Sequence, residues 1–357
     1  MIDLRRLGYN EQVVDIEGDY LLGRIVAVHR ELYKVICNSG ERDAVLKASI
    51  YHHGEAGEIF PTVGDFVLID YNASGSSRIV KTLERKSYFS RKDPDVGRGE
   101  QVVAANFDYV FILMSLNHDF NLKRLERYLA ASWQSGGIPV VVLTKADLTP
   151  NYEDLVKQVA DTAIGVEVIV ISSKTGFGLE NLNKFIQPGK TIVCLGSSGV
   201  GKSSLVNALL GADCMKTSGI REEDSKGHHT TTHRQLLFLE NGAMLIDTPG
   251  MRELGMWDIT TGLGETFVDI EGLIQKCKFS DCTHHNEPGC AINEALINGD
   301  LLPTRWQSYL KLQKEAAYSA NKALYFQRVK EKAKSNAKFI KQKKQARNKD
   351  QYNKGDF

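Results

Sequence analysis

The sequence predicts a multidomain protein: a small β-barrel, an α/β domain with a parallel sheet, and a mostly helical C-terminal domain. Three observations lead to this fold class: a series of short strand-like runs, then strands alternating with helices, then a compact group of cysteines. The chain has 357 residues and 42% apolar residues. At roughly 100–200 residues per domain, this length accommodates two or three domains with cores of their own.

Residues 1–86 are expected to form the barrel. Five strand-length runs, partly with period-two alternation, are separated by turn residues: LLGRIVAVH, LYKVICN, DAVLKAS, DFVLIDY and SRIVKTL. Five short strands over this length fit an OB-type barrel, a fold that binds RNA or single strands but also serves as a spacer. Residues 87–100 are polar and rich in turn residues, so we expect a linker there.

Residues 101–256 predict the α/β domain. Continuous apolar runs, typical of strands buried on both faces, occur in VVAANFDYVFILMSL, GGIPVVVLTKAD, VEVIVIS and KTIVCLG. Helical periodicity lies between them at 121–134 and 152–164, and another helix begins at 201. This alternation favours a parallel sheet. Residues 257–357 form the last domain, irregular at first and helical beyond Pro303.

The formal charge is +1, from 45 basic and 44 acidic residues. Residues 326–357 hold eleven basic and three acidic residues, a net of +8, so the rest of the chain carries −7. This basic tail favours an anionic partner such as nucleic acid, although a solvated helical end is an alternative. No run approaches the roughly 18 apolar residues of a membrane span, and the N-terminus lacks a signal-peptide core. We therefore expect a cytoplasmic protein without a membrane partner. We also expect a monomer.

A phosphate-binding loop is predicted between a buried strand and a helix, where GSSGVGKSS matches the pattern GxxxxGK[ST]. Its glycines let backbone amides turn inward toward phosphate oxygens at a helix N-terminus. Lys202 is expected to reach the β and γ phosphates, and the Ser203 hydroxyl to bind Mg²⁺. The predicted contacts are Gly196, Ser197, Ser198, Gly199, Val200, Gly201, Lys202, Ser203 and Ser204.

Two further segments indicate which base is bound. The run Thr144, Lys145, Ala146, Asp147 ends a buried strand and resembles the [NT]KxD guanine motif of GTPases. Guanine offers two donors to the Asp147 carboxylate, whereas adenine would leave it unpaired. Thr144 replaces the commoner Asn, so one hydroxyl must do the work of an amide. After the next strand, SSK resembles the loop that contacts the guanine oxygen, with Ser172, Ser173 and Lys174.

The γ-phosphate and its metal ion are expected to meet two later segments. The run DTPG follows the strand AMLI, with Asp247 holding Mg²⁺ through water and the Gly250 amide sensing the γ-phosphate. Between this run and the phosphate loop lies GHHTTT, residues 227–232, a candidate switch I. One of its threonines, taken as Thr231, is expected to join Mg²⁺ when GTP is bound.

The motifs stand in a permuted order. In ordinary GTPases the phosphate loop comes first, whereas here TKAD and SSK precede it. The α/β domain is therefore a circularly permuted P-loop GTPase domain, which is tolerable because domain termini often lie close together. DTPG now ends the domain, about thirty residues before the cysteine group.

The sequence closely resembles the RsgA/YjeQ family of circularly permuted GTPases over nearly its whole length. The resemblance rests on QVVAANFDYVFILMSL, DFNLKRLERYLAASW, TKADL, GSSGVGKSSLVNALLG, KGHHTTTHRQL, DTPGMREL and CKFSDCTHHNEPGCAI. It implies an OB barrel, a permuted GTPase domain and a zinc domain. It also implies slow GTP hydrolysis stimulated by the 30S subunit, binding to its rRNA, and a late maturation checkpoint that includes release of another assembly factor.

The resemblance also bears on catalysis. Met251 stands where many GTPases place a glutamine that orients water, so slow turnover of the free protein is expected. The resemblance points to His229 as the replacement, with Lys202 at the phosphates. His228 is a second candidate for this role. The alternative is that both histidines only contact RNA or solvent.

The cysteine group predicts a structural zinc site. Cys277, Cys282, His284 and Cys290 offer three thiolates and one imidazole within fourteen residues, a closed tetrahedral set for Zn²⁺. His285 is a rival ligand, and the resemblance favours His284. Free buried cysteines are the alternative. We expect the ion to hold the domain's fold.

The main functional hypothesis is a GTPase of the small ribosomal subunit, whose basic tail contacts rRNA phosphates. One alternative is a GTP-regulated RNA-binding module with incidental hydrolysis. The other is an unrelated signalling or metabolic P-loop NTPase, which predicts similar turnover with ATP and indifference to ribosomes.

Overall fold

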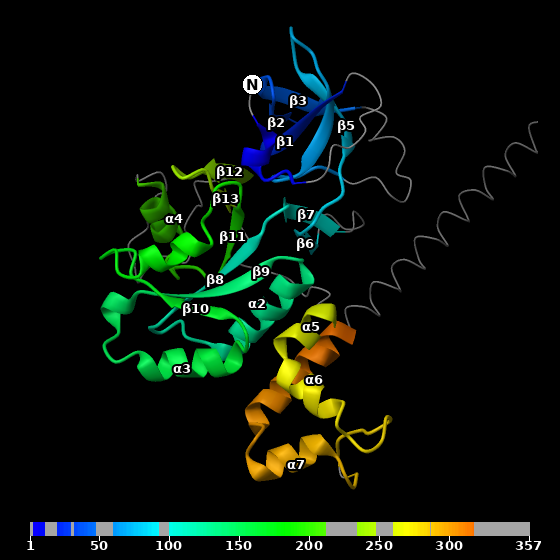
Figure 1. Ribbon diagram of the computed structural model, residues 1–357, viewed down its shortest axis with the longest axis vertical. Coiled ribbons are helices and arrows are strands. Elements are labelled where there is room, and N and C mark those ends of the chain that lie inside the picture. Colours follow the sequence, from blue (N-terminus) through cyan, green and yellow to red (C-terminus); the bar gives the residue numbers. More distant parts are fainter. Residues whose placement is uncertain are drawn as a thin grey trace, which may run out of the picture.

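The computed structural model describes residues 3–10, 20–29, 32–47, 60–92, 100–211, 234–247, 260–285 and 287–317. Three parts follow one another along the long axis of the molecule (Figure 1). The barrel lies at one end, the sheet domain in the middle and the C-terminal helices at the other end. A short 3₁₀ helix, η1 (Leu4–Leu7), precedes the barrel.

Five strands form the barrel: β1 (Tyr20–His29), β2 (Leu32–Cys37), β3 (Gly40–Leu46), β4 (Phe66–Asp70) and β5 (Ser77–Thr82). Each overlaps one of the five runs predicted from the sequence, although β3 begins before the run DAVLKAS. The strand order is β1-β2-β3-β5-β4, and β1 also pairs with β4, so the barrel closes. Alternate side chains of β2, Tyr33, Val35 and Cys37, point into the core because successive residues of a strand face opposite sides.

A two-stranded sheet follows the barrel and corrects the linker prediction. Strand β6 (Tyr88–Lys92) pairs antiparallel with β7 (Glu100–Ala105), so residues 88–92 are not a linker. Residues 93–99 lie outside the described residues. The polar character of SYFSRK concealed the strand. Phe89 is nevertheless fully buried and stacks on Phe107, with ring centroids 4.9 Å apart.

The central sheet runs in the order β10-β9-β8-β11-β13-β12. Its parallel strands are β8 (Tyr109–Ser115), β9 (Ile138–Thr144), β10 (Glu167–Val170), β11 (Thr191–Leu195) and β13 (Met244–Asp247). Strand β12 (Arg234–Phe238), which the sequence analysis missed, pairs antiparallel with β13. It also pairs with β1, placing Ala27 opposite Gln235, so the barrel and the sheet are joined edge to edge.

Helical segments cover both faces of this sheet: η2 (Ala146–Leu148), α2 (Leu122–Gln134), α3 (Glu153–Thr162), η3 (Leu179–Lys184) and α4 (Lys202–Leu210). Within β8, Val110 and Ile112 belong to the core that includes Leu125 of α2. The intervening Phe111 belongs to the core that includes Leu205 of α4. A strand buried on both faces needs apolar residues at every position, which explains the continuous apolar runs.

The C-terminal part contains α5 (Thr260–Thr266), α6 (Val268–Ile274), α7 (Ala291–Asn298) and a helical segment at 303–317. Helix α5 packs so closely on α2 that a Cβ at Gly262 would collide with the carbonyl oxygen of Ala130. The buried Arg305 forms an ion pair with Asp269, 2.7 Å between Nε and Oδ2, and donates to the Thr162 carbonyl of α3. These contacts fix the last helices on the sheet domain. None of the helices in the described ranges combines the length and apolar character that a bilayer crossing demands.

A buried guanidinium ties the barrel to the sheet domain. Arg24 of β1 is fully buried and donates hydrogen bonds to four oxygen acceptors: the carbonyl oxygens of Leu7 (2.5 Å), Gly64 (3.1 Å) and Asn106 (2.9 Å), and the Thr191 hydroxyl (2.9 Å). It also donates to the Met244 sulfur at 3.3 Å. Burial lowers the pKa of Arg24 to about 10, and the charges of Asp108 and Asp65 oppose the shift. The group therefore stays protonated at neutral pH.

Replacing Arg24 with methionine should destabilise the protein by about 3–5 kcal/mol, because several buried acceptors lose their donor at once. The measurement is urea unfolding followed by circular dichroism, with Arg78→Met as the control, since Arg78 is exposed on β5. Equal unfolding midpoints for the two variants would show that the Arg24 hydrogen bonds do not hold the barrel to the sheet.

Candidate nucleotide site and metal centre

The predicted phosphate loop connects β11 to α4, as the motif requires. Its three glycines all have positive φ: 153° at Gly196, 70° at Gly199 and 108° at Gly201. A Cβ at Gly196 would lie 2.7 Å from the Leu113 carbonyl oxygen, so a larger residue cannot be accommodated without a shift. The glycines therefore allow the tight turn that the sequence analysis expected of them.

The Lys202 side chain forms hydrogen bonds with backbone carbonyls of the phosphate loop. Its Nζ donates to the carbonyl oxygens of Gly196 (2.6 Å) and Ser197 (2.5 Å). In phosphate-binding loops of this type the lysine reaches the β and γ phosphates. The ammonium group of Lys202 thus lies beside the loop that would receive them.

The threonine of TKAD holds the phosphate loop. The Thr144 hydroxyl, on a side chain that is 2% exposed, donates to the Val200 carbonyl at 2.6 Å. Its single proton is used within the protein, so any contact of Thr144 with a base would have to use the oxygen as an acceptor. Thr144 links the loop after β9 to the loop after β11.

The two segments predicted to read the base lie together. The Ser172 hydroxyl donates to the Asp147 carboxylate at 2.7 Å, and the Ala146 amide donates to the Ile171 carbonyl at 3.2 Å. Asp147 is exposed, while Ser172 is buried and fixes its orientation. Of the remaining predicted contacts, Lys145 and Ser173 are half-buried and Lys174 is exposed.

Asp247 fits the metal role assigned to it. It ends β13, and its Oδ2 is buried with no hydrogen-bond partner among the described residues. Burial raises the pKa of Asp247 to about 6, and the charge of Lys202 opposes the shift. A buried carboxylate oxygen without a donor suits a hydrated divalent cation, which prefers oxygen ligands. Ser203 lies in the first turn of α4, next to Lys202.

Several predicted site residues lie outside the described residues. They are His228, His229, Thr231, Gly250 and Met251, together with the basic segment 326–357. Their predicted roles in catalysis, Mg²⁺ binding and RNA binding stay predictions.

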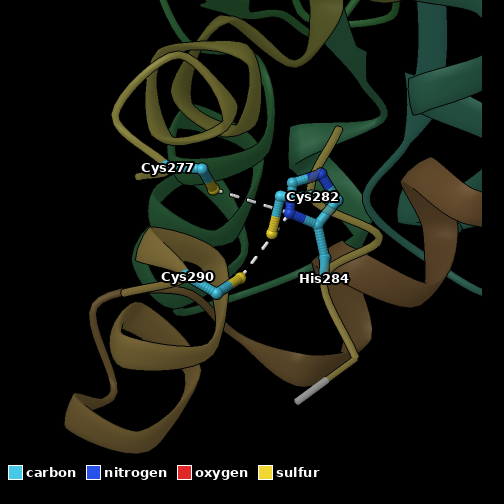
Figure 2. A group of neighbouring side chains, drawn as sticks. All are labelled: Cys277, Cys282, His284 and Cys290. Carbon is cyan, nitrogen blue, oxygen red and sulfur yellow. Dashed lines mark hydrogen bonds between the residues drawn. The ribbon is translucent and has the colours of Figure 1, made fainter. Parts of the chain in front are cut away.

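The predicted zinc ligands converge on one point (Figure 2). The ligand atoms of Cys277, Cys282, His284 and Cys290 all lie within 4.8 Å of one another. The sulfurs of Cys277 and Cys290 are each 3.6 Å from His284 Nδ1. Ligand bonds of about 2.0–2.3 Å to a tetrahedral Zn²⁺ place its ligands about 3.5–3.8 Å apart, so the cluster could hold this ion.

The local backbone brings His284, rather than its neighbour, into the cluster. His284 adopts a left-handed conformation with φ of 62°, and its ring lies edge-on to Trp306, 5.7 Å between centroids. His285 is not part of the cluster, and its amide donates to Glu287 at 2.9 Å. Gly289 also has a positive φ, and its carbonyl accepts from the Lys278 amide, which closes the loop around the ligands.

Comparison with known proteins identifies the family. The chain is 48% identical over 314 residues to "Small ribosomal subunit biogenesis GTPase RsgA 1" of Listeria monocytogenes, which covers 88% of each chain. The RsgA GTPase family model matches residues 82–257. The chain belongs to the RsgA family. A relative from Methanosarcina acetivorans is 42% identical over 88% of this chain and 86% of its own.

Two solved structures agree with the fold. YjeQ from Thermotoga maritima is 28% identical, with a TM-score of 0.64, over 84% of this chain and 99% of its own. YloQ, described as a circularly permuted GTPase, is 24% identical, with a TM-score of 0.61, over 86% and 99%. The resemblance and the permuted multidomain fold predicted from the sequence are confirmed.

The sequence analysis missed one residue at the phosphate loop of this RsgA protein. Asp119, in the loop after β8, accepts a hydrogen bond from the Ser197 hydroxyl. A signal was present, since loops at the carboxyl ends of parallel strands line the ligand site and LNHDFN is such a loop.

Replacing Cys290 with serine should abolish metal binding, because Zn²⁺ favours thiolate over hydroxyl. Elemental analysis of the full-length protein should fall from about one zinc per chain to almost none. Cys37→Ser is the control, since that thiol bonds Ser39 and the Gly40 carbonyl within the barrel. Retention of zinc by the Cys290 variant would contradict the four-ligand assignment.

Proposed function

We propose that this protein is a GTPase acting in late maturation of the 30S ribosomal subunit, which hydrolyses GTP to GDP and phosphate when the subunit stimulates it. The observation that carries the proposal is the convergence of the phosphate loop, the Asp147–Ser172 pair and Asp247 at the carboxyl edge of one sheet. Its curated relatives, named for small ribosomal subunit biogenesis, match over most of the chain.

In this proposal GTP contacts three loops: residues 196–204, the TKAD segment and the SSK segment, together with Gly250. Lys202 Nζ leaves the Gly196 and Ser197 carbonyls for the β and γ phosphates. Asp147 accepts from the guanine edge while Ser172 keeps it oriented. Ser203, Thr231 and Asp247 would hold Mg²⁺, and this ion would neutralise phosphate charge.

Catalysis is proposed to depend on His229, with His228 as the second candidate. Met251 has no group that can orient a water molecule, so the free protein lacks one part of a hydrolytic site. Docking on the subunit completes the catalytic site, which makes hydrolysis a signal that the subunit has reached a given stage.

The flanking parts are proposed to bind the subunit. We propose a barrel domain over residues 1–86, a GTPase domain over 101–256 and a last domain over 257–357, in which Zn²⁺ would be a structural ion. The barrel, this zinc domain and the basic tail contact rRNA, and hydrolysis helps to release other assembly factors. We place the protein in the cytoplasm as a monomer.

Purified 30S subunits should stimulate GTP hydrolysis by a factor on the order of 10² or more, without a matching effect on ATP. Because rRNA contacts release counterions, the stimulation should fall as salt rises from about 50 to 200 mM. The measurement is phosphate release with and without subunits, at both salt concentrations.

In the same assay, His229→Ala should lose the stimulated rate while retaining nucleotide binding. Unchanged stimulation in this variant would undo the histidine assignment. Absence of any stimulation in the unaltered protein would favour an RNA-binding module with incidental hydrolysis, and equal ATP turnover would favour an unrelated NTPase.

Replacing Asp147 with asparagine should weaken GDP binding by at least about tenfold, because one guanine donor then faces an amide donor. Xanthine carries a carbonyl at that position, so the variant should gain affinity for xanthosine diphosphate. The measurement is isothermal titration with both nucleotides, with Asp161→Asn, an exposed acid on α3, as control. An unchanged preference for guanine would count against the base-reading role.

A further inference from the structure

An acidic residue outside the predicted nucleotide-contact segments contacts the phosphate loop. Asp119 lies between the end of β8 and the start of α2. Its carboxylate accepts a hydrogen bond from the Ser197 hydroxyl through Oδ2 and forms an ion pair with Arg124 through Oδ1, at 2.8 Å. The Asp119 side chain is 27% exposed, so this contact is partly shielded from water.

The position of Asp119 is fixed by the first turn of α2. Arg124 also donates to the Asp119 backbone carbonyl, so it binds the residue at two points. The Arg124 amide in turn donates to Asn121 Oδ1 at 3.0 Å, where Asn121 caps the helix. Asp119 is therefore held by the first turn of α2, a helix whose Leu125 packs in the sheet core.

Ser197 lies where the phosphates would enter. Its carbonyl oxygen accepts from Lys202 Nζ at 2.5 Å, and that ammonium group reaches the β and γ phosphates in loops of this kind. At the other side of the loop, Thr144 binds the Val200 carbonyl. The loop is thus held at two points, by the segment after β8 and by the segment after β9.

We propose that Asp119 is a positioning residue for the phosphate loop, acting through the Ser197 hydroxyl; this rests on the guanine nucleotide site proposed above. The bond orients Ser197 and commits its only hydroxyl proton to the protein, so that hydroxyl does not donate to phosphate. The ion pair with Arg124 offsets the carboxylate charge beside an anionic ligand. A loop that is already held in the conformation that binds phosphate loses less conformational entropy when the nucleotide binds.

The test is a double-mutant cycle on the full-length protein, read out as the dissociation constants of fluorescent GDP and of a non-hydrolysable fluorescent GTP analogue. Ser197→Ala and Asp119→Ala should each weaken binding roughly three- to tenfold. The double variant should bind nucleotide no more weakly than the weaker-binding single variant, because each single variant already removes the same hydrogen bond. Asp119→Asn keeps an acceptor oxygen and should bind nearly as the unaltered protein does.

Matched measurements separate positioning from loss of fold. Thermal unfolding midpoints should stay unchanged in Ser197→Ala, which removes one oxygen atom, and Asp161→Ala on α3 should leave both affinities unchanged. Additive losses, unchanged affinity in Ser197→Ala, or equal losses in Asp119→Asn and Asp119→Ala would each overturn the proposal. If the unaltered protein binds no guanine nucleotide, the proposed function fails as well, whereas normal binding with unaffected variants overturns only the positioning role.

Discussion

The buried guanidinium of Arg24 is the contact on which the relative placement of barrel and sheet depends. A buried cation costs several kcal/mol unless its donors are satisfied, and here the acceptors come from η1, the segment before β4 and the start of β11. If the barrel moved relative to the sheet, the buried charge of Arg24 would lose hydrogen-bond acceptors. Thr191, one of the acceptors, begins the strand whose other end carries the phosphate loop.

Among the described residues, those predicted to bind nucleotide lie at the carboxyl ends of the parallel strands of the same sheet. Parallel strands have their carboxyl ends on the same side of the sheet, so the loops after β8, β9, β10 and β11 meet there with the end of β13, whatever their order in the chain. This explains why a permuted order is harmless to the site. Cross-links such as Thr144 to Val200 and Ser172 to Asp147 then join loops that are distant in sequence.

Much of this arrangement could be predicted because its signals are local. The barrel strands, the phosphate loop and the four metal ligands are marked by alternation, glycine spacing and cysteine spacing. Strand β6 was mistaken for a linker because only Phe89 reveals its burial. Arg24 in LLGRIVAVH looks like a solvent-facing residue of an alternating strand, since its partners lie up to 220 residues away. Asp119 escaped notice for the same reason, 78 residues from Ser197.

The central claim is that the carboxyl edge of the sheet binds a guanine nucleotide with Mg²⁺, and its most direct test is a crystal structure of the protein with GDP and Mg²⁺. We expect the purine edge on the Asp147 carboxylate, Lys202 Nζ transferred from the Gly196 and Ser197 carbonyls to a phosphate, and Asp247 facing the hydrated ion. A nucleotide bound elsewhere, or Lys202 still bonded to those carbonyls beside a bound phosphate, would contradict it.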